Sequence, residues 1–428
     1  MAYNKEELKN SKTFCMAPWM SIHHWPDGKT YPCCLWNSRD PIGNLNDSSL
    51  KEIWNNETMK KTRQGMLKDE KISSCDRCYH LEDTGDGSYR QRINKEHWDK
   101  IDYVNETKED GHLDNMNLHL WDLRISNFCN FKCRSCGHAL SSSWHKDAIA
   151  LGEADPNAKA LISISDKSKF LQDIEPHYNC VDEIYFAGGE PLVMPEHYQI
   201  LDRLIELGRT DVRIRYSTNF SKLTFKGKHI FDYWKQFPNL ELYISIDGVG
   251  KVGELVRKGY DDELFYKNVQ LYKESGVAHT DYAYAVTYGA LNYNHLFDMV
   301  LDFFERDIID QNVTKTSRKI FFSPIDYPTH YDSVFLPDSF KNKFIQRFEG
   351  FDKEILSRFP KVHNHVLEDI MRKLKTVYDR SITKQFNFEE MAKCKSVTDK
   401  LDLLRDEKFK HVFGFDSTEF VINQTKVI

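Results

Sequence analysis

The chain has 428 residues, 40% of them hydrophobic and 13% aromatic, which suits two or three globular domains better than one. The 59 basic and 65 acidic side chains give a net charge of −6, whereas nucleic-acid-binding and membrane-surface proteins usually carry a basic excess, so we expect neither of these partners. The first residues are polar, without the apolar core of a signal peptide, and no stretch reaches the roughly 18 apolar residues of a membrane span. A cytoplasmic protein is expected.

Ten cysteines are an unusual number for such a chain. In a small secreted protein they would predict disulfides, but this chain is large and shows no secretion signal. In a reducing compartment, clustered cysteines more often bind metal or carry out redox chemistry. Their spacing decides between these uses.

Residues 1–112 form the first of three regions that differ in pattern, and they hold five of the cysteines. Residues 19–25 and 29–33 are predicted to form two short strands joined by a Pro-Asp-Gly turn. Residues 48–67 follow with apolar residues at helical spacing, which predicts one helix.

Between residues 113 and 330, short apolar runs alternate with helical patterns such as 197–207 and 293–304. This alternation predicts an α/β fold, with a parallel sheet covered by helices, and six strands fit an open or a closed barrel equally well. Residues 331–428 lose the strand signal and repeat apolar residues at helical spacing, which predicts a packed helical extension. The predicted strands span residues 118–125, 183–186, 212–217, 240–246, 282–287 and 319–323.

Three cysteines follow the first predicted strand of the α/β region. Cys129, Cys133 and Cys136 have the order C-x3-C-x2-C, in a loop that leaves the carboxyl end of a strand, where α/β folds place their ligands. A [4Fe–4S] cluster is normally held by four thiolates, so three cysteines leave one iron open to a substrate or cofactor. A structural zinc site completed by a distant histidine is the alternative.

This loop resembles the signature of the radical S-adenosylmethionine (SAM) superfamily. Relatives also have a glycine-rich segment after the second strand that meets the amino group of SAM, and a Gly-Gly-Glu-Pro segment follows the second predicted strand here. The resemblance implies a partial (β/α)6 TIM-like barrel in residues 113–330. One difference is Ser135, where many relatives have an aromatic residue, which leaves the packing of adenine to Phe131 or another side chain. The implied SAM contacts are Gly188, Gly189, Glu190, Pro191, Asn219, Ser245, Asp247 and Arg257, with the ribose at Ser245 and Asp247.

The second group of cysteines lies upstream, where Cys15 and Cys33 precede the pair Cys75-x2-Cys78. It resembles the auxiliary-cluster modules called SPASM and twitch, and the shorter twitch type is the better match because no further cysteine follows closely. Relatives usually carry this module after the barrel. The resemblance implies that these four cysteines hold a second [4Fe–4S] cluster, while a four-cysteine zinc site is the alternative. Cys34 could replace Cys33 as a ligand or be a spare thiol.

Four polar residues of the first region have simpler explanations. His23 and His24 alternate along a predicted strand, so one of them is expected to be exposed and neither need bind a metal. Glu82 and Arg90 recur beside the last cysteine pair in similar proteins, and a surface ion pair explains them equally well.

By resemblance, the chain is a radical SAM enzyme whose cofactors are two [4Fe–4S] clusters and SAM. It would cleave SAM to a 5′-deoxyadenosyl radical that takes hydrogen from a substrate, with the auxiliary cluster assisting electron transfer and a reductase, flavodoxin or ferredoxin as donor. A peptide or protein substrate is favoured; the aromatic-rich helical extension could shape a cleft for it, although core packing explains these aromatic residues equally well. The alternatives are a dehydrogenase of a small carbohydrate-like molecule and a non-catalytic iron–sulfur or zinc-binding protein. No catalytic acid or base can be named from the sequence.

Overall fold

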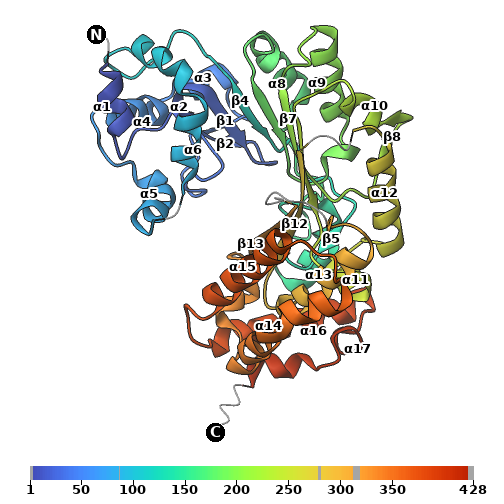
Figure 1. Ribbon diagram of the computed structural model, residues 1–428. Coiled ribbons are helices and arrows are strands. Elements are labelled where there is room, and N and C mark those ends of the chain that lie inside the picture. The colour runs from blue at the N-terminus through green and yellow to red at the C-terminus, as the bar shows by residue number, and fades with distance from the viewer. Residues whose placement is uncertain (1–2, 86, 278–280, 312–318, 423–428) are drawn as a thin grey trace. The chain divides into compact units, whose positions relative to one another are not determined.

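The computed structural model describes residues 3–85, 87–277, 281–311 and 319–422. The chain folds into two compact units, each built from several segments (Figure 1). The first consists of Met1–Phe128, Leu161–Ser217 and Thr224–Glu241, and the second of Cys129–Ala160, Thr218–Leu223 and Leu242–Ile428. The change from the first unit to the second therefore falls directly before Cys129. The division of the sequence at residues 112 and 330 stays a prediction.

A mixed sheet forms the centre of the first unit, with the strand order β3-β2-β1-β4-β6-β7. Parallel pairing joins β1 to β4, β4 to β6 and β6 to β7, while the hairpin of β1, β2 and β3 is antiparallel. The amino-terminal hairpin thus extends the parallel sheet at the β4 edge. The strands are β1 Ser21–His24, β2 Lys29–Tyr31, β3 Gly43–Asn44, β4 Leu120–Leu123, β6 Glu183–Phe186 and β7 Arg213–Thr218.

The two faces of this sheet differ in chemistry, because successive side chains of a strand point to opposite sides. One face is apolar and covered by helices: Phe170 of α8 packs on His24, with ring centroids 5.1 Å apart, and His197 of α9 lies 2.7 Å from the hydroxyl of Tyr216. The other face carries polar and charged side chains. The helices of the unit are α1 Lys5–Asn10, α2 Ala17–Met20, α3 Leu50–Trp54, α4 Glu57–Leu67, η1 Ser73–Cys75, α5 Asp76–Asp83, α6 Tyr89–Glu96, η2 Trp98–Glu106, α8 Lys167–Ile174, η4 Glu175–His177, η5 Pro191–Val193, α9 Pro195–Glu206 and α10 Ile230–Trp234, beside the short hairpin β8 Thr224–Phe225 and β9 Lys228–His229.

Three details of the amino-terminal prediction are wrong. The first strand begins at Ser21, because the preceding residues form α2 with a proline in its first turn, where proline fits best. The helix predicted over residues 48–67 is two helices, since Asn56 caps a new helix by accepting from the N–H of Met59. His23 and His24 are both buried, one on each face of the sheet, so neither is exposed.

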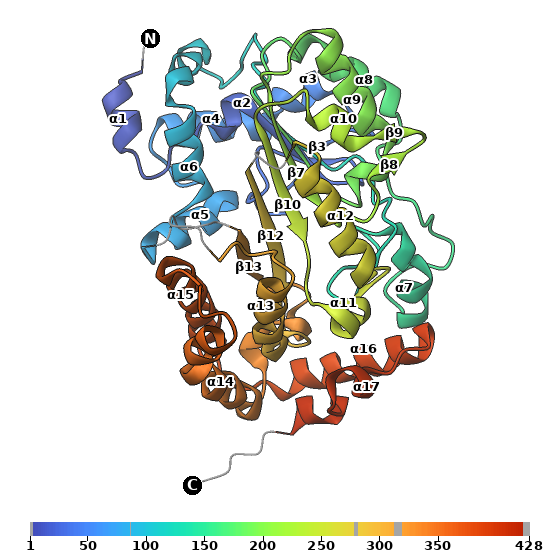
Figure 2. The same ribbon diagram turned by 45° about the vertical axis from the view of Figure 1, so that its right-hand side comes forward.

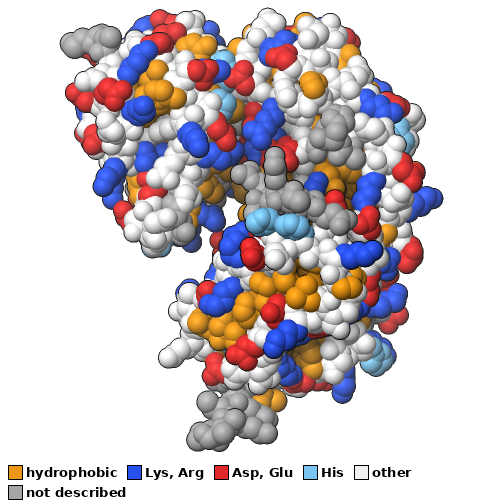
Figure 3. Space-filling model, viewed as in Figure 1, with side chains coloured by type: hydrophobic (Ala, Val, Ile, Leu, Met, Phe, Trp, Pro, Cys, Tyr) orange, Lys and Arg blue, Asp and Glu red, His pale blue; other side chains and the backbone are white. Residues whose placement is uncertain are grey.

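In the second unit, β12 pairs in parallel with β13, and β10 follows β12 in the strand order. Helices α14 to α17 lie together in the lower part of both views, near the carboxyl terminus of the chain (Figures 1 and 2). Their core is aromatic: the ring of Phe344 lies 4.5 Å from Tyr293 and 4.6 Å from Phe297. Hydrophobic side chains also reach the surface over α14 and α15 (Figure 3). The elements are β5 Lys132–Cys133, η3 Ser142–Trp144, α7 His145–Leu151, β10 Leu240–Ser245, α11 Gly250–Val256, β11 Arg257–Lys258, α12 Asp262–Glu274, β12 Asp281–Tyr288, η6 Tyr293–His295, α13 Leu296–Glu305, β13 Ile320–Pro324, η7 Thr329–Tyr331, η8 Ser333–Phe335, α14 Asp338–Arg358, α15 Asn364–Ser381, α16 Phe388–Arg405, α17 Phe409–Phe413 and η9 Ser417–Val421.

The predicted fold class is confirmed. The strands expected between residues 113 and 330 appear as β4, β6, β7, β10, β12 and β13, each within two residues of its predicted ends, and helices follow them. A parallel α/β core with a helical carboxyl-terminal region results, as in a partial TIM-like barrel. Among the described residues, no helix combines the length and the apolar character that a membrane span requires.

Candidate functional site

The loop of Cys129, Cys133 and Cys136 is fixed at its middle by the second unit. β5, which ends at Cys133, pairs antiparallel with β11, so that Arg257 lies opposite Cys133. The carbonyl of Cys133 accepts a hydrogen bond of 2.7 Å from the indole Nε1 of Trp144. The three cysteines therefore lie on a short stretch whose backbone is held from two sides.

A buried ion pair stands beside these thiols. Nη1 of Arg257 lies 2.7 Å from one carboxylate oxygen of Asp247, whose other oxygen accepts from the N–H of Thr287 at 2.7 Å. Burial raises the pKa of Cys133, and Arg257 acts in the opposite direction. Burial, followed by the neighbouring Cys133, raises the pKa of Cys136 to about 12. Iron binding must remove these protons, and the guanidinium favours their loss.

Two further residues of the predicted SAM set lie in this unit. Nδ2 of Asn219 donates to Oδ1 of Asn130 at 3.0 Å, and the Asn219 oxygen accepts from the N–H of Ser221 at 3.0 Å. Asn130 directly follows the first cysteine, so Asn219 helps to fix the start of the loop. Ser245 is the last residue of β10 and is half-buried.

The cysteine loop is also tied to the carboxyl-terminal helices. Arg134, which lies between the second and third cysteines, is fully buried. Its Nη2 pairs with the carboxylates of Asp402 and Glu407, the latter at 2.7 Å. Burial works against the charge, but these two carboxylates raise the pKa of Arg134 above its ordinary value. A helix more than 250 residues away in the chain thus neutralises the arginine of the loop.

Arg405 makes a second link of the same kind. Its Nε lies 2.8 Å from a carboxylate oxygen of Asp147, and its guanidinium carbon lies 4.7 Å from the centre of the Trp144 ring. Asp147 also forms an ion pair with Lys132 of the loop, whose Nζ lies 3.1 Å from a carboxylate oxygen. Trp144 in turn donates to the carbonyl of Cys133. Arg405, at the end of α16, therefore contacts the residues that fix the backbone of the loop.

The Gly-Gly-Glu-Pro segment lies in the first unit, after β6. Gly188 has a φ of +103°, which suits glycine, and the N–H of Gly189 donates to the carbonyl of Ser126 at 3.2 Å. The N–H of Glu190 donates to the carbonyl of Phe128 at 2.8 Å. A Cβ atom at Gly189 would lie only 2.2 Å from that carbonyl oxygen. The second glycine is therefore required for a close approach to the backbone directly before Cys129.

The side chain of Glu190 is buried and caps the short helix η5, which begins at Pro191. One of its carboxylate oxygens accepts from the N–H of Leu192 at 3.1 Å. The predicted SAM-binding carboxylate is thus fixed by its own backbone.

The upstream cysteines come together in the first unit. Cys15 precedes α2, Cys33 follows β2, and Cys75 and Cys78 lie at η1 and α5. Burial and the thiol of Cys78 raise the pKa of Cys15 to about 12. Burial, and then the thiols of Cys34, Cys15 and Cys75, raise the pKa of Cys33. Each of these thiols thus raises the pKa of another member of the set or has its own pKa raised by one.

Within the described ranges, no three histidine, cysteine, aspartate or glutamate side chains lie close enough to hold a single metal ion. The upstream thiols instead influence one another's pKa: after burial, neighbouring thiols are the main cause that raises the pKa of Cys33 and of Cys75.

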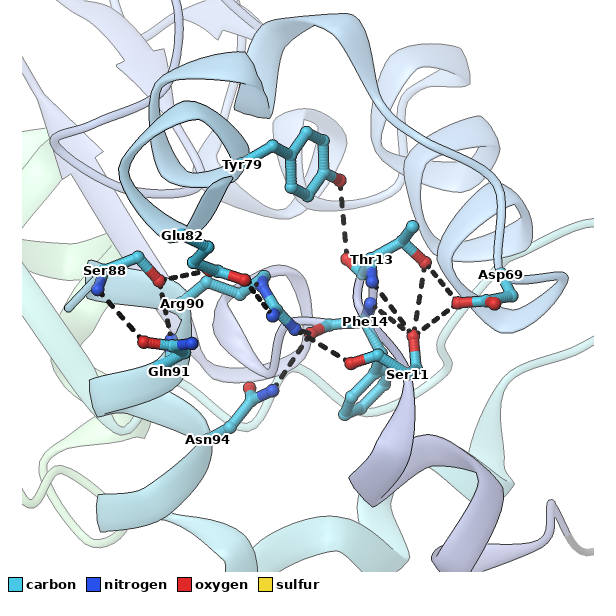
Figure 4. A network of polar contacts seen from close by, with 10 residues as sticks. All are labelled: Ser11, Thr13, Phe14, Asp69, Tyr79, Glu82, Ser88, Arg90, Gln91 and Asn94. Atoms are coloured by element: carbon cyan, nitrogen blue, oxygen red, sulfur yellow. Dashed lines mark hydrogen bonds and ion pairs between the residues drawn. The ribbon is translucent and has the colours of Figure 1, made fainter. Parts of the chain in front are cut away.

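Residues of α6 bond to the backbone on both sides of Cys15, and Figure 4 shows the bonds of Arg90 and Asn94 to Phe14. Nη1 of Arg90 donates to the carbonyl of Phe14 at 2.8 Å, and Nδ2 of Asn94 donates to the same oxygen at 2.9 Å. The amide oxygen of Asn94 accepts from the N–H of Met16 at 2.8 Å. Arg90 is buried and pairs through two nitrogens with Glu82, so the expected surface ion pair is a buried one.

The sequence left open whether Cys33 or Cys34 belongs to the upstream set, and the surroundings of the two thiols differ in the structure. Cys33 joins the upstream set through its electrostatic coupling to Cys15 and Cys75, whereas the side chain of Cys34 is exposed. This difference favours Cys33 over Cys34 as the fourth cysteine of the upstream set.

Several residues that position these sites escaped the sequence analysis. They bond to backbone carbonyls or form buried ion pairs with residues that are distant in the sequence, so no local sequence pattern predicts these contacts. A buried arginine without an obvious local partner is the one sequence signal that could have suggested them. They are Asn94, Arg134, Trp144, Asp147, Asp402, Arg405 and Glu407.

Comparison with known families matches two parts of the chain. Residues 123–294 match the radical SAM superfamily, and residues 15–79 match SPASM, an iron–sulfur cluster-binding domain. No curated protein matches the chain.

Similar solved structures include native anSMEcpe with bound AdoMet, at 16% identity and a TM-score of 0.37, where the match covers 54% of this chain and 61% of that chain. Another is Streptococcus suis SuiB bound to the precursor peptide SuiA, at 15% identity and a TM-score of 0.35, covering 74% of this chain and 64% of that chain. The match thus spans less than two thirds of the length of either solved protein.

Proposed function

The chain belongs to the radical SAM superfamily, and on that premise we propose that it cleaves SAM reductively and abstracts a hydrogen atom from a peptide or protein substrate. The superfamily domain binds SAM and a [4Fe–4S] cluster, and the amino-terminal domain binds an auxiliary iron–sulfur cluster. When bound and reduced, these groups supply the electron and the 5′-deoxyadenosyl radical. A reductase, flavodoxin or ferredoxin is the proposed electron donor.

The observation that carries this proposal is the cysteine loop with its own supports. Three thiols offer one ligand fewer than the irons of a [4Fe–4S] cluster, so one iron stays open for SAM. The backbone bonds from Trp144 and β11 hold the loop, and Arg257 supplies the positive charge that favours thiolates. The proposed ligands of this cluster are Cys129, Cys133 and Cys136, and those of the auxiliary cluster are Cys15, Cys33, Cys75 and Cys78.

The residues proposed to bind SAM form two groups, one for its methionyl part and one for its ribose. Gly188, Gly189, Glu190 and Pro191 shape the backbone after β6, where donors and acceptors of the main chain can meet the methionyl group. Asp247 is already engaged by Arg257 and the N–H of Thr287. Each of its oxygens still has a lone pair, so it can accept from a ribose hydroxyl while staying fixed. Asn219 and Ser245 complete the proposed set.

A peptide or protein substrate is supported by the place of β13 at the end of the strand order. This strand ends the strand order, and Phe321 on it is 55% exposed. An extended peptide can add to such an edge through main-chain hydrogen bonds, with side-chain contacts giving specificity. We propose β13 as the element along which the substrate peptide lies.

The test is anaerobic reconstitution of the chain with iron and sulfide, followed by SAM and dithionite and quantification of 5′-deoxyadenosine. We expect product from the native chain and at least a thousandfold less from a variant with Cys129, Cys133 and Cys136 changed to Ala. The matched control changes Cys15, Cys33, Cys75 and Cys78 to Ala, which should lower the iron content by about half and leave some SAM cleavage, since a [4Fe–4S] cluster holds four irons. Equal product from the native chain and the first variant would overturn the proposal.

A further inference from the structure

The polar face of the sheet in the first unit carries one continuous row of side chains. Strand pairing places His23 of β1 beside Asp122 of β4, Asp122 beside Tyr185 of β6, and Tyr185 beside Arg215 of β7. Residues that pair across strands point to the same side. The four side chains therefore form a row across four strands, near the carboxyl ends where parallel sheets place ligands.

The charges on this face are balanced. Arg124 lies 3.4 Å from Asp122, Arg213 lies 2.6 Å from Glu241, and Arg215 lies 2.7 Å from Glu183. Three guanidinium groups thus face three carboxylates, and neither sign is in excess. Such a surface does not select a charged ligand, and it suits one with uncharged hydrogen-bonding groups.

His23 is a buried histidine of this row, and its two ring nitrogens have different surroundings. Its side chain is 1% exposed, and Nδ1 lies 2.9 Å from a carboxylate oxygen of Asp122. Nε2, on the other side of the ring, is buried and has no hydrogen-bond partner within the part of the chain that the structure describes. A buried polar atom without a partner costs free energy, so this nitrogen requires a ligand or an ordered water.

The environment of His23 also fixes which nitrogen carries the proton. Although burial alone would raise it, the guanidinium of Arg124 and the hydrogen bond from His23 lower the pKa of Asp122 to about 2, so this carboxyl is ionised. A bare Nδ1 would place its lone pair against this carboxylate, which is repulsive, and the proton of a neutral ring therefore belongs on Nδ1. Nε2 is then a hydrogen-bond acceptor that points away from the carboxylate.

We propose that His23 Nε2 is the acceptor for an uncharged N–H or O–H group of the substrate, with Asp122 as the positioning residue that fixes the tautomer. This inference rests on the proposed function for the existence of a substrate, and it adds the chemistry of the group that the site recognises. An amide N–H of a peptide and a hydroxyl of a carbohydrate-like molecule share this chemistry.

The test uses the full chain without iron, with its histidines labelled with 15N, and long-range 1H–15N NMR spectra. His23→Gln and His24→Gln each remove one signal and so assign the two neighbouring rings. His24 is the matched control, because it is equally buried on the same strand but faces the apolar side. We expect the hydrogen of His23 on Nδ1 and a bare Nε2, and loss of this preference in Asp122→Asn.

Two probes then distinguish the sources of the donor: N-methylacetamide for a peptide group and methanol for a hydroxyl. One of them should shift the His23 Nε2 signal in a saturable way, at least tenfold more weakly in Asp122→Asn, and leave His24 unchanged. Saturation by N-methylacetamide supports a peptide substrate, and saturation by methanol alone a carbohydrate-like one. A hydrogen on Nε2, or equal responses of His23 and His24 to both probes, overturns the inference.

The outcome is separable from that of the proposed function. The His23 spectra are recorded without iron and without SAM, so they do not depend on whether the chain cleaves SAM. A chain that makes no 5′-deoxyadenosine but shows the predicted His23 spectra would overturn the proposed function alone.

Discussion

The loop of Cys129, Cys133 and Cys136 and the set of Cys15, Cys33, Cys75 and Cys78 are supported from different parts of the chain. Buried ion pairs from the carboxyl-terminal helices hold the loop, through Arg134 and Arg405. Hydrogen bonds to backbone carbonyls and amides hold the upstream set, and their side chains lie within 80 residues of Cys15. The first arrangement makes the loop depend on the end of the chain, whereas the amino-terminal region contains its own support. Loss of support should therefore affect the two sets separately.

The largest expected effect comes from Arg134→Ala, which leaves Asp402 and Glu407 facing a cavity with no guanidinium. Removing one partner of a buried ion pair costs about 3 kcal/mol, so the free energy of unfolding should fall by this amount. Iron at the loop should be lost with it, and SAM cleavage should fall at least tenfold. Urea unfolding, iron analysis and the 5′-deoxyadenosine assay measure these effects.

The control for Arg134→Ala is Lys395→Ala on α16. Lys395 pairs with Asp399 on the same helix, and both side chains are at least 30% exposed. Exposed pairs contribute about 0.5 kcal/mol or less, so this variant should behave like the native chain. Equal losses in the two variants would show that α16 stabilises the fold in general and not the loop through Arg134.

The features that could be predicted from the sequence are those set by residues close together in the chain. The strands of the α/β region and the two groups of cysteines were predictable, because periodicity and short spacing are local signals. The ion pairs of Arg134 were not, since the partners are more than 250 residues apart and only the fold brings them together. His23 shows the same limit: alternation correctly placed His23 and His24 on opposite faces of the sheet, but the local pattern could not show that both side chains are buried. The helix break at Asn56 was readable in principle, because asparagine is a common amino-terminal cap.

The second effect is that of Arg90→Ala on the upstream set. This change removes two donors to the segment before Cys15 and leaves Glu82 buried without its partner, so we expect a loss of about 2 kcal/mol. About half of the iron should be lost, while formation of 5′-deoxyadenosine persists. Arg92→Ala is the control, because Arg92 lies on the same helix in an exposed pair with Glu96. Loss of SAM cleavage in Arg90→Ala would contradict the independence of the two sets.

Gly189→Ala tests the backbone contact that precedes the loop. Its Cβ would lie 2.2 Å from the carbonyl oxygen of Phe128, and overpacking of this kind costs about 1–3 kcal/mol. We expect a loss of stability in that range and weaker SAM binding, measured by urea unfolding and by equilibrium dialysis. Gly137→Ala is the control, since Gly137 directly follows Cys136 and a Cβ there meets no atom within 4 Å. A stable Gly189→Ala chain with native SAM affinity would show that the segment can move without consequence.

The smallest effect concerns the charge beside the thiols, in the chain without iron. The pKa of Cys15 is raised from 9.0 to about 12 in the folded state, so the folded chain keeps a proton that the unfolded chain loses above pH 9. This stabilisation is complete below pH 9 and is lost as the pH rises toward 12, at no more than about 1.4 kcal/mol per pH unit for one thiol. Cys15→Ala should reduce the slope of unfolding free energy between pH 9 and 10.5. Cys133→Ala should reduce it less, because Arg257 opposes the rise of that pKa. Equal slopes in the two variants would show that the positive charge of Arg257 does not distinguish the loop from the upstream set.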